Sequence, residues 1–423
     1  MKYKLTRLRN SLRLIVVPMP TLESVTVTVW VGVGSRYEAK MVSGLSHFLE
    51  HMVFKGSKKR PSAKKISEAI DSFGGEFNAS TSKEWTNFYI KARAAKLSTA
   101  MDVLSDMVLA PLLKPEDIER EKGVILEEMA MYEDTPIAKI EDYFERLIFK
   151  GNSLGRDIVG DQDSVKSIGQ RDFIDYRDKN YSPENIVITI AGGVSFKKAS
   201  ELTKRYFSAI KVRPKANYRK FVYGKVCPKV LLKSKKIEQA HLVLGFFGNP
   251  RKHKLRYAEA LLSTILGGGM SSRMFTEVRE KRGLAYAVKT SSEHFVDCGY
   301  LATYAGVDLK RIDEAIKVIL EQYFGLTQGR FPISKKEFKK AKEFVKGHLA
   351  LALEDTNDVN GFFGIRELLD KEIETPDEVY KKIDKVEVDE VVSVAKSLFV
   401  PRKLNLAIIG PYKESAHFES LLA

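Results

Sequence analysis

The spacing of apolar residues singles out one stretch of the chain, residues 44–56 (GLSHFLEHMVFKG). It runs without Pro or Gly from Leu45 to Lys55, which is about three helical turns. Its apolar side chains recur at intervals of three and four residues, as on the buried stripe of a helix (Leu45, Phe48, Leu49, Met52 and Val53). The pattern predicts a half-buried helix at this place.

Other segments predict strands and helices around this helix. Residues 14–19 and 25–34 have the β-branched composition of strands, and the second run alternates strictly. Helices are predicted at 63–73, at 96–109 and from Pro115 onward. The remaining predicted strands are two runs within 76–90 and one at 186–191.

The order of motifs in the first half returns in the second half. VWVGVGS (29–35) parallels VLGFFGN (243–249), MYEDTP (131–136) parallels ALEDTN (352–357), and IVITIAG (186–192) parallels LNLAIIG (404–410). Their common order predicts a duplicated domain. Between the halves lies a basic stretch with Pro214 and little apolar periodicity. We therefore predict domains at 1–212 and 226–423, joined by a linker at 213–225.

Three polar residues lie together beside the apolar stripe of the first predicted helix. His47 and His51 are one turn apart, and two imidazoles at this spacing can hold one Zn²⁺ at roughly 2.0–2.1 Å. Glu50 would lie beside such a metal rather than on it, where a base for an activated water belongs. The order is HxxEH, the inverse of HExxH. Packed or surface histidines would show the same pattern, so a zinc site needs a third ligand.

Length, composition and charge narrow the class of protein. With 423 residues, 44% of them hydrophobic and 10% aromatic, the chain suits two globular domains. Its net charge of +15 comes partly from lysine clusters at 58–65 and 335–346, but no nucleic-acid-binding motif accompanies them. The second cluster has helical spacing and predicts a solvated face. We therefore expect no nucleic-acid partner.

The sequence shows no pattern typical of secretion or of membrane insertion. Cys227 and Cys298 have no CxxC spacing and provide no disulfide framework. Residues 1–20 contain only a short apolar run, and no apolar stretch is long enough for a transmembrane helix. These observations predict a soluble, cytoplasmic protein with no membrane partner.

The helix predicted from Pro115 onward carries candidate carboxylates. Glu121 and Glu128 are seven residues apart and share one face, whereas Glu127 points about 100° away. From the residues alone, the ordinary interpretation of these glutamates is that they are solvated.

The motif at 44–56, followed about seventy residues later by EREKGVILEE, resembles the pitrilysin/insulinase-type inverted-zincin metallopeptidases. The chain length resembles their two-domain, mitochondrial processing peptidase-like branch. The resemblance implies that Glu128, 77 positions after His51, is the third zinc ligand and that Glu121 orients a ligating histidine. It also implies one Zn²⁺ per chain. The implied fold is α+β, with two homologous domains that each pack helices on a mostly antiparallel mixed sheet.

The resemblance also implies elements that bind substrate. In this family an edge strand with an NAxT-like sequence accepts the peptide as an added strand. The implied substrate-binding residues are Asn78, Ala79, Ser80 and Thr81 on that strand and Gly267, Gly268 and Gly269 in a glycine-rich loop. Arg279 and Tyr286 match an Arg–Tyr pair that lies over the zinc and the substrate carbonyl in the closed enzyme. Without the resemblance, a hairpin arm, a surface arginine and a strand tyrosine remain open interpretations.

The second half lacks the residues that would bind zinc. In the aligned repeat, the positions of His47, Glu50, His51 and Glu128 are occupied by Ala260, Ser263, Thr264 and Leu349. The second domain is therefore predicted to supply substrate-binding elements without a metal site.

The resemblance, together with these residues, implies a zinc-dependent endopeptidase that hydrolyses unfolded or short peptides inside a closed dimeric chamber. Arg279 and Tyr286 would come from the second domain of the other subunit, in a homodimer or in a heterodimer with a paralogue. The alternative is a non-catalytic partner subunit of a processing peptidase-like heterodimer. Such subunits usually lack intact ligands, whereas all four catalytic positions are present here.

Overall fold

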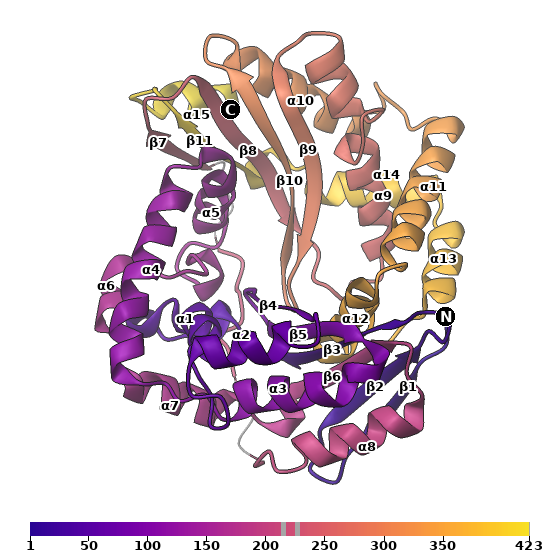
Figure 1. Ribbon diagram of the computed structural model, residues 1–423. Helices are drawn as coiled ribbons and strands as arrows, with labels where there is room; N and C mark the ends of the chain where they lie inside the picture. The colour runs from indigo at the N-terminus through magenta and orange to yellow at the C-terminus, as the bar shows by residue number, and fades with distance from the viewer. Residues whose placement is uncertain (213–216, 225–228, 423) are drawn as a thin grey trace. The chain divides into compact units, whose positions relative to one another are not determined.

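The computed structural model describes residues 1–212, 217–224 and 229–422. These residues form two compact units, each made of segments from both halves of the chain (Figure 1). The first unit comprises Met1–Ala130, Arg156–Arg219 and Ala350–Thr375. The second comprises Met131–Gly155, Lys220–Leu349 and Pro376–Ala423. Each unit is described below by itself.

The first unit is built on a six-stranded mixed sheet with the order β1-β2-β6-β3-β5-β4. Its strands are β1 (Lys4–Arg7), β2 (Arg13–Pro18), β3 (Ser24–Val31), β4 (Glu76–Thr81), β5 (Thr86–Arg93) and β6 (Ile186–Gly192). Only the pair β2–β6 is parallel. The central strand β3 is buried from Val25 to Val31, because helices cover both of its faces. β4 is an edge strand.

The helices of the first unit include the one predicted from the HxxEH stretch, α1 (Leu45–Val53). The others are α2 (Ala63–Asp71), α3 (Leu97–Leu109), α4 (Pro115–Glu133, whose last turn belongs to the second unit), α6 (Gln162–Ser167), α7 (Gln170–Asn180), α8 (Phe196–Phe207) and α12 (Thr356–Ile365). The predicted helices at 63–73 and 96–109 are confirmed, and their ends differ from the prediction by at most two residues. The third predicted helix begins at Pro115, as expected.

The second unit repeats the topology of the first. Its sheet has the order β7-β11-β8-β10-β9 and a single parallel pair, β7–β11, which corresponds to β2–β6. Its strands are β7 (Lys229–Ser234), β8 (Gln239–Gly248), β9 (Ala285–His294), β10 (Gly299–Asp308) and β11 (Leu404–Gly410). Its helices are α5 (Pro136–Ile148), α9 (Arg256–Gly267), α10 (Ile312–Thr327), α11 (Lys335–Ala352), α13 (Pro376–Lys385), α14 (Val388–Leu398) and α15 (Ala416–Leu422). The predicted α+β fold of two similar domains is confirmed.

The continuous domains predicted at 1–212 and 226–423 differ from the two compact units. α5 comes from the first half of the chain but packs on β8 and β11 of the second unit. α12 comes from the second half but packs on β3 and β6 of the first unit. The two halves therefore exchange equivalent helices, each of which buries its apolar face on the other half's sheet. Of the predicted linker at 213–225, residues 213–216 and 225 lie outside the described residues, as does Cys227.

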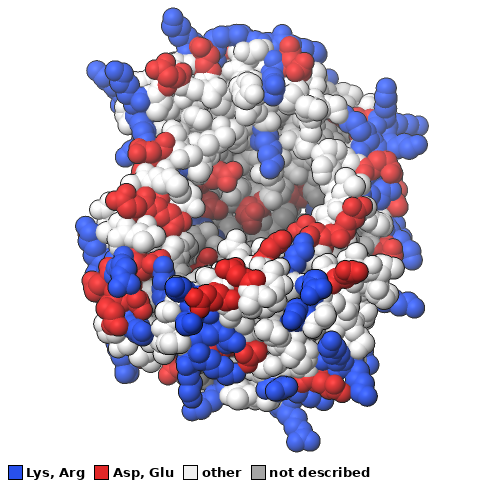
Figure 2. Space-filling view, viewed as in Figure 1, with Lys and Arg blue, Asp and Glu red and all other residues white. Residues whose placement is uncertain are grey.

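Charged side chains of both signs lie on the face of the molecule that is shown in Figure 2. Figure 2 shows Lys and Arg side chains over the visible face, interleaved with Asp and Glu. Of the lysines in the second cluster, which lie in α11, four are exposed and two are half-buried. The exposed ones are Lys335, Lys336, Lys339 and Lys340, and the half-buried ones are Lys342 and Lys346. Within the residues that the structure describes, no helix is long and apolar enough to cross a membrane.

Candidate metal centre

The N-terminus of α1 is fixed by a buried carboxylate instead of a capping side chain on the helix itself. Gly44, the residue before α1, has φ +93, and a Cβ there would lie 2.5 Å from the carbonyl oxygen of Val159. The backbone nitrogens of Gly44 and Ser46 donate to the carboxylate of Glu38 at 2.8 and 2.7 Å. Burial raises the pKa of Glu38 to about 7, although these hydrogen bonds act in the opposite direction. This cap sets where the following turn of α1 places its histidines.

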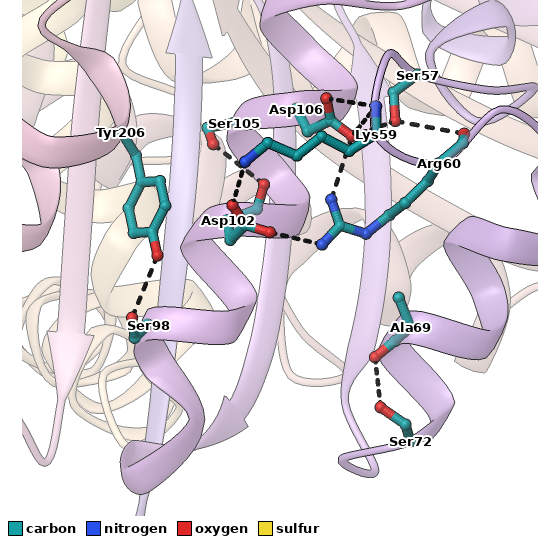
Figure 3. A network of polar contacts seen from close by, with 10 residues as sticks. All are labelled: Ser57, Lys59, Arg60, Ala69, Ser72, Ser98, Asp102, Ser105, Asp106 and Tyr206. Atoms are coloured by element: carbon teal, nitrogen blue, oxygen red, sulfur yellow. Dashed lines mark hydrogen bonds and ion pairs between the residues drawn. The ribbon is translucent and has the colours of Figure 1, made fainter.

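The segment that follows α1, at residues 57–60, is held in place by polar contacts with α3 (Figure 3). Lys59 and Arg60 both pair with Asp102 of α3, each at 2.6 Å. Arg60 and the hydroxyl of Ser57 also contact Asp106, at 3.1 and 2.6 Å. These basic residues of the first lysine cluster are therefore engaged by acidic residues of the same unit.

Three side chains from α1 and α4 converge on one point. His47 Nε2 lies 3.6 Å from Oε1 of Glu128, and His51 Nε2 lies 3.5 Å from Oε2 of the same carboxylate. One ligand atom from each of the three residues lies within 4.8 Å of the other two. Among the described residues, this is the single group of three or more His, Cys, Asp or Glu side chains with such spacing.

The arrangement of these atoms fits a tetrahedral metal ion. The separations of 3.5 and 3.6 Å are too long for good hydrogen bonds. Two ligand atoms that each lie 2.0–2.1 Å from a tetrahedral zinc are about 3.4 Å apart, which is close to the distances seen here. Burial, and then the neighbouring His51, lower the pKa of His47 to about 3. His47 is therefore neutral near pH 7, the form in which imidazole binds a metal.

Glu121 orients the second histidine. Its Oε1 lies 2.9 Å from His51 Nδ1, so the Nδ1–H donates to Glu121 and Nε2 is left free to face Glu128. Its Oε2 forms an ion pair with Lys55 at 2.5 Å. Burial alone would raise the pKa of Glu121, but the hydrogen bonds with His51 and Lys55 lower it below its ordinary value. Glu121 is therefore ionised near pH 7.

Glu50 lies beside this group and is not one of its three converging residues. The hydroxyl of Thr81, the last residue of β4, donates to Oε2 of Glu50 at 2.5 Å. Burial raises the pKa of Glu50, although the Thr81 hydrogen bond and His51 act to lower it. A raised pKa brings a carboxylate closer to the range useful for accepting and returning a proton.

The predicted substrate-binding residues lie on two different units. Asn78, Ala79, Ser80 and Thr81 form the second part of the edge strand β4, whose side chains alternate between exposed and half-buried. In the second unit Gly267 ends α9, and Gly268 and Gly269 follow it. Arg279 lies between two aromatic rings there, 4.7 Å from that of Phe275 and 5.0 Å from that of Tyr286. Arg279 and Tyr286 are therefore brought together, and Tyr286 is 77% exposed.

In the second unit, α9 occupies the place of α1 but carries no ligand residues at the corresponding positions. The hydroxyls of Ser263 and Thr264 donate to the carbonyl oxygen of Ala260, at 3.0 and 2.8 Å. These side chains are therefore satisfied by their own helix. The second copy therefore has no imidazole or carboxylate at these positions.

The sequence did not predict three contacts that support the candidate metal centre. They are made by Glu38 with the start of α1, by Lys55 with Glu121 and by the Thr81 side chain with Glu50. Lys55 follows His51 by four residues, two residues beyond the end of α1, and this short separation could have suggested that it lies nearby. Glu38 and Thr81 approach α1 from separate segments, and no sequence pattern places them there.

The fold and the centre define a class of protein: two similar α+β units, of which the first carries a two-histidine, one-glutamate group. Two family models match the chain, "Insulinase (Peptidase family M16)" at residues 13–162 and "Peptidase M16 inactive domain" at residues 167–345. An uncharacterized zinc protease of Streptomyces coelicolor is 36% identical over 97% of this chain and 90% of its own length. Another, from Bacillus subtilis, is 36% identical over 95% of this chain and 97% of its own length.

Solved structures show the same relationship. The crystal structure of a protease from Helicobacter pylori has a TM-score of 0.89 at 25% identity and covers 97% of this chain and 99% of its own. A structure from Pseudomonas fluorescens, described as a peptidase M16 inactive domain, has a TM-score of 0.89 at 18% identity and covers 98% and 99%, which supports the fold alone. The chain belongs to the insulinase family of peptidases, family M16.

Proposed function

We propose that this protein is a zinc-dependent endopeptidase of the HxxEH type, from the two-domain, mitochondrial processing peptidase-like branch of its family. The observation that carries the proposal is the convergence of His47, His51 and Glu128 on one point, with Glu50 beside them. These three residues would hold one Zn²⁺ per chain. The bound metal would polarise the scissile carbonyl and lower the pKa of water in the site.

The protein's own groups then handle the proton. Glu50 takes a proton from the attacking water and passes it to the nitrogen of the leaving amine. Glu121 keeps the Nδ1–H of His51 in place, so that Nε2 of His51 remains available to the metal. The hydroxyl of Tyr286 and the guanidinium of Arg279, which lie together on the second unit, would stabilise the negative charge that develops on the carbonyl oxygen.

The edge strand β4 supports the proposal that substrates are extended and unfolded. Residues Asn78 to Thr81 are paired with β5 on one side, and β4 is the last strand of its sheet. A peptide added along the free edge would bind through main-chain hydrogen bonds, whatever its side chains. The loop Gly267 to Gly269 would contact the same peptide. In a folded protein most backbone groups are already paired, which leaves few extended segments available for this pairing.

The function is tested by digestion of a disulfide-stabilised protein before and after reduction and alkylation, together with a random peptide pool. The zinc-loaded enzyme should cleave the pool and the unfolded form, with fragments detected by mass spectrometry, and should leave the folded form intact. Removal of the metal by a chelator should stop cleavage, and added zinc should restore it. A zinc-loaded protein that cleaves none of these substrates would contradict the proposal.

We further propose that the active protein is a dimer, most simply a homodimer, which encloses a chamber. The metal group and the Arg279–Tyr286 pair lie on different compact units of the chain. In a two-fold dimer, each site would combine the first unit of one subunit with the second unit of the other. The active sites would then face an enclosed space that admits unfolded peptides.

Complementation between two inactive chains tests this assembly. A Glu50→Gln chain and a Tyr286→Phe chain, each with little activity alone, should recover part of the wild-type rate when mixed, because one site of each mixed dimer is intact. Subunit exchange is verified by mass spectrometry of an isotope-labelled partner. No recovery after verified exchange would show that each site is built within one chain.

A further inference from the structure

The candidate base is tied to the end of the edge strand. Thr81 is the last residue of β4, and its hydroxyl lies 2.5 Å from Oε2 of Glu50. An ionised carboxylate can only accept hydrogen bonds, so Thr81 is the donor. No other described residue hydrogen-bonds the Glu50 carboxylate, which leaves Oε1 free. One oxygen is therefore held by the protein, while the other remains available to a water.

The turn that follows Thr81 is fixed by the segment that leads into α1. The backbone nitrogen of Ser35 donates to the carbonyl oxygen of Ser82 at 3.2 Å, and that of Arg36 donates to the carbonyl oxygen of Lys83 at 2.9 Å. Because these are main-chain hydrogen bonds, they fix the path of the backbone directly after Thr81.

Side chains lock the same turn. Arg36 and Glu84 form an ion pair at 2.5 Å, and their side chains are 0% and 3% exposed. The ammonium of Lys83, which is also buried, donates to the carbonyl oxygen of Arg156 at 2.7 Å. Separating a buried ion pair leaves an uncompensated charge, which strongly opposes movement of this turn. The end of β4, and Thr81 with it, is therefore held in a fixed position relative to α1.

We propose that Thr81 is a positioning residue, which holds the Glu50 carboxylate in the orientation required for proton transfer. The inference rests on the proposed peptidase function. The terminal torsion of a glutamate is broad, so without this hydrogen bond the carboxylate would sample several orientations. A peptide that pairs along β4 would lie against the strand whose last side chain holds the base. The same strand would thus position both the peptide and the base.

The test compares Thr81→Val, which keeps the shape but lacks the donor, with Thr81→Ser, which keeps the donor. Thr81→Val should lower kcat about 10- to 100-fold, with KM and zinc content close to those of the wild type. Thr81→Ser should recover most of the lost kcat. Thr99→Val, at an exposed position of α3, is the matched control and should leave kcat unchanged.

Two results would overturn this role: an unchanged kcat in Thr81→Val, or a Thr81→Ser variant as defective as Thr81→Val. Should the wild type itself hydrolyse no peptide, the proposed function fails separately. Crystal structures of the wild type and Thr81→Val then test the positioning role directly. The Glu50 carboxylate should be ordered in the first and reoriented or disordered in the second, and an unchanged carboxylate would refute the inference.

Discussion

Replacing Glu50 with glutamine should reduce peptide hydrolysis by at least about a hundredfold, within the roughly 10²–10⁴-fold contributed by general-base catalysis. The amide has nearly the same shape as the carboxylate, and its oxygen can still accept the hydrogen bond from Thr81. It cannot take up a proton from water. The three converging residues are untouched, so the zinc content should stay near one per chain. Turnover and elemental analysis of the same preparation measure both effects.

This variant separates catalysis from metal binding. If the Glu50→Gln variant lost its bound zinc as well as its activity, Glu50 would have a role in building the site. Near-normal turnover in a zinc-loaded Glu50→Gln protein would exclude Glu50 as the base. It would also reopen the interpretation of the chain as a protein whose HxxEH stretch is not used in catalysis.

The parts of the centre that lie on one helix could be predicted from the sequence. The spacing of apolar residues in 44–56 determines which face of α1 is buried, and the same periodicity places His47 and His51 one turn apart. Glu121 and Glu128 likewise share a face because they lie about two helical turns apart on α4. What the periodicity could not supply was the approach of the two helices, and for that the prediction depended on the family resemblance.

The sequence pattern could not predict interactions between distant segments of the chain. The motif repeats at 131–136 and 352–357 were recognised, yet nothing in them indicates that the helices α5 and α12 pack on the sheet of the opposite half. Amphipathic helices bury an apolar face on any complementary sheet, and two similar sheets offer nearly equivalent places. The exchange therefore depends on tertiary packing rather than on local preference.

The contacts of Glu38 and Thr81 with the region of α1 could not be predicted from the sequence either. Each is a hydrogen bond between a side chain and a group that lies 6 to 31 residues away in the sequence. Thr81 was predicted to bind substrate through its backbone, and the structure adds a hydrogen bond from its side chain to Glu50. Such contacts depend on the angle at which β4 meets α1, which no residue spacing specifies.

The proposed third ligand, Glu128, has a neighbour on the same helix that serves as a control. Glu128 points toward His47 and His51, whereas Glu127 is exposed on another face of α4. Glu128→Gln removes a negatively charged ligand and should weaken zinc affinity by at least about a hundredfold, since even residues that only support a ligand contribute roughly 10- to 100-fold. Peptide hydrolysis should fall with zinc occupancy. Glu127→Gln makes the same chemical change one residue away and should alter neither property.

The most direct test of the metal centre is therefore a zinc titration of metal-free Glu128→Gln, Glu127→Gln and wild-type protein, with zinc content and peptide hydrolysis measured at each step. The wild type and Glu127→Gln should bind one zinc per chain with high affinity and gain activity in proportion. Glu128→Gln should stay largely empty and inactive at the same zinc concentration. Full zinc binding and activity in Glu128→Gln, or their loss in Glu127→Gln, would contradict the assignment of His47, His51 and Glu128 as the site.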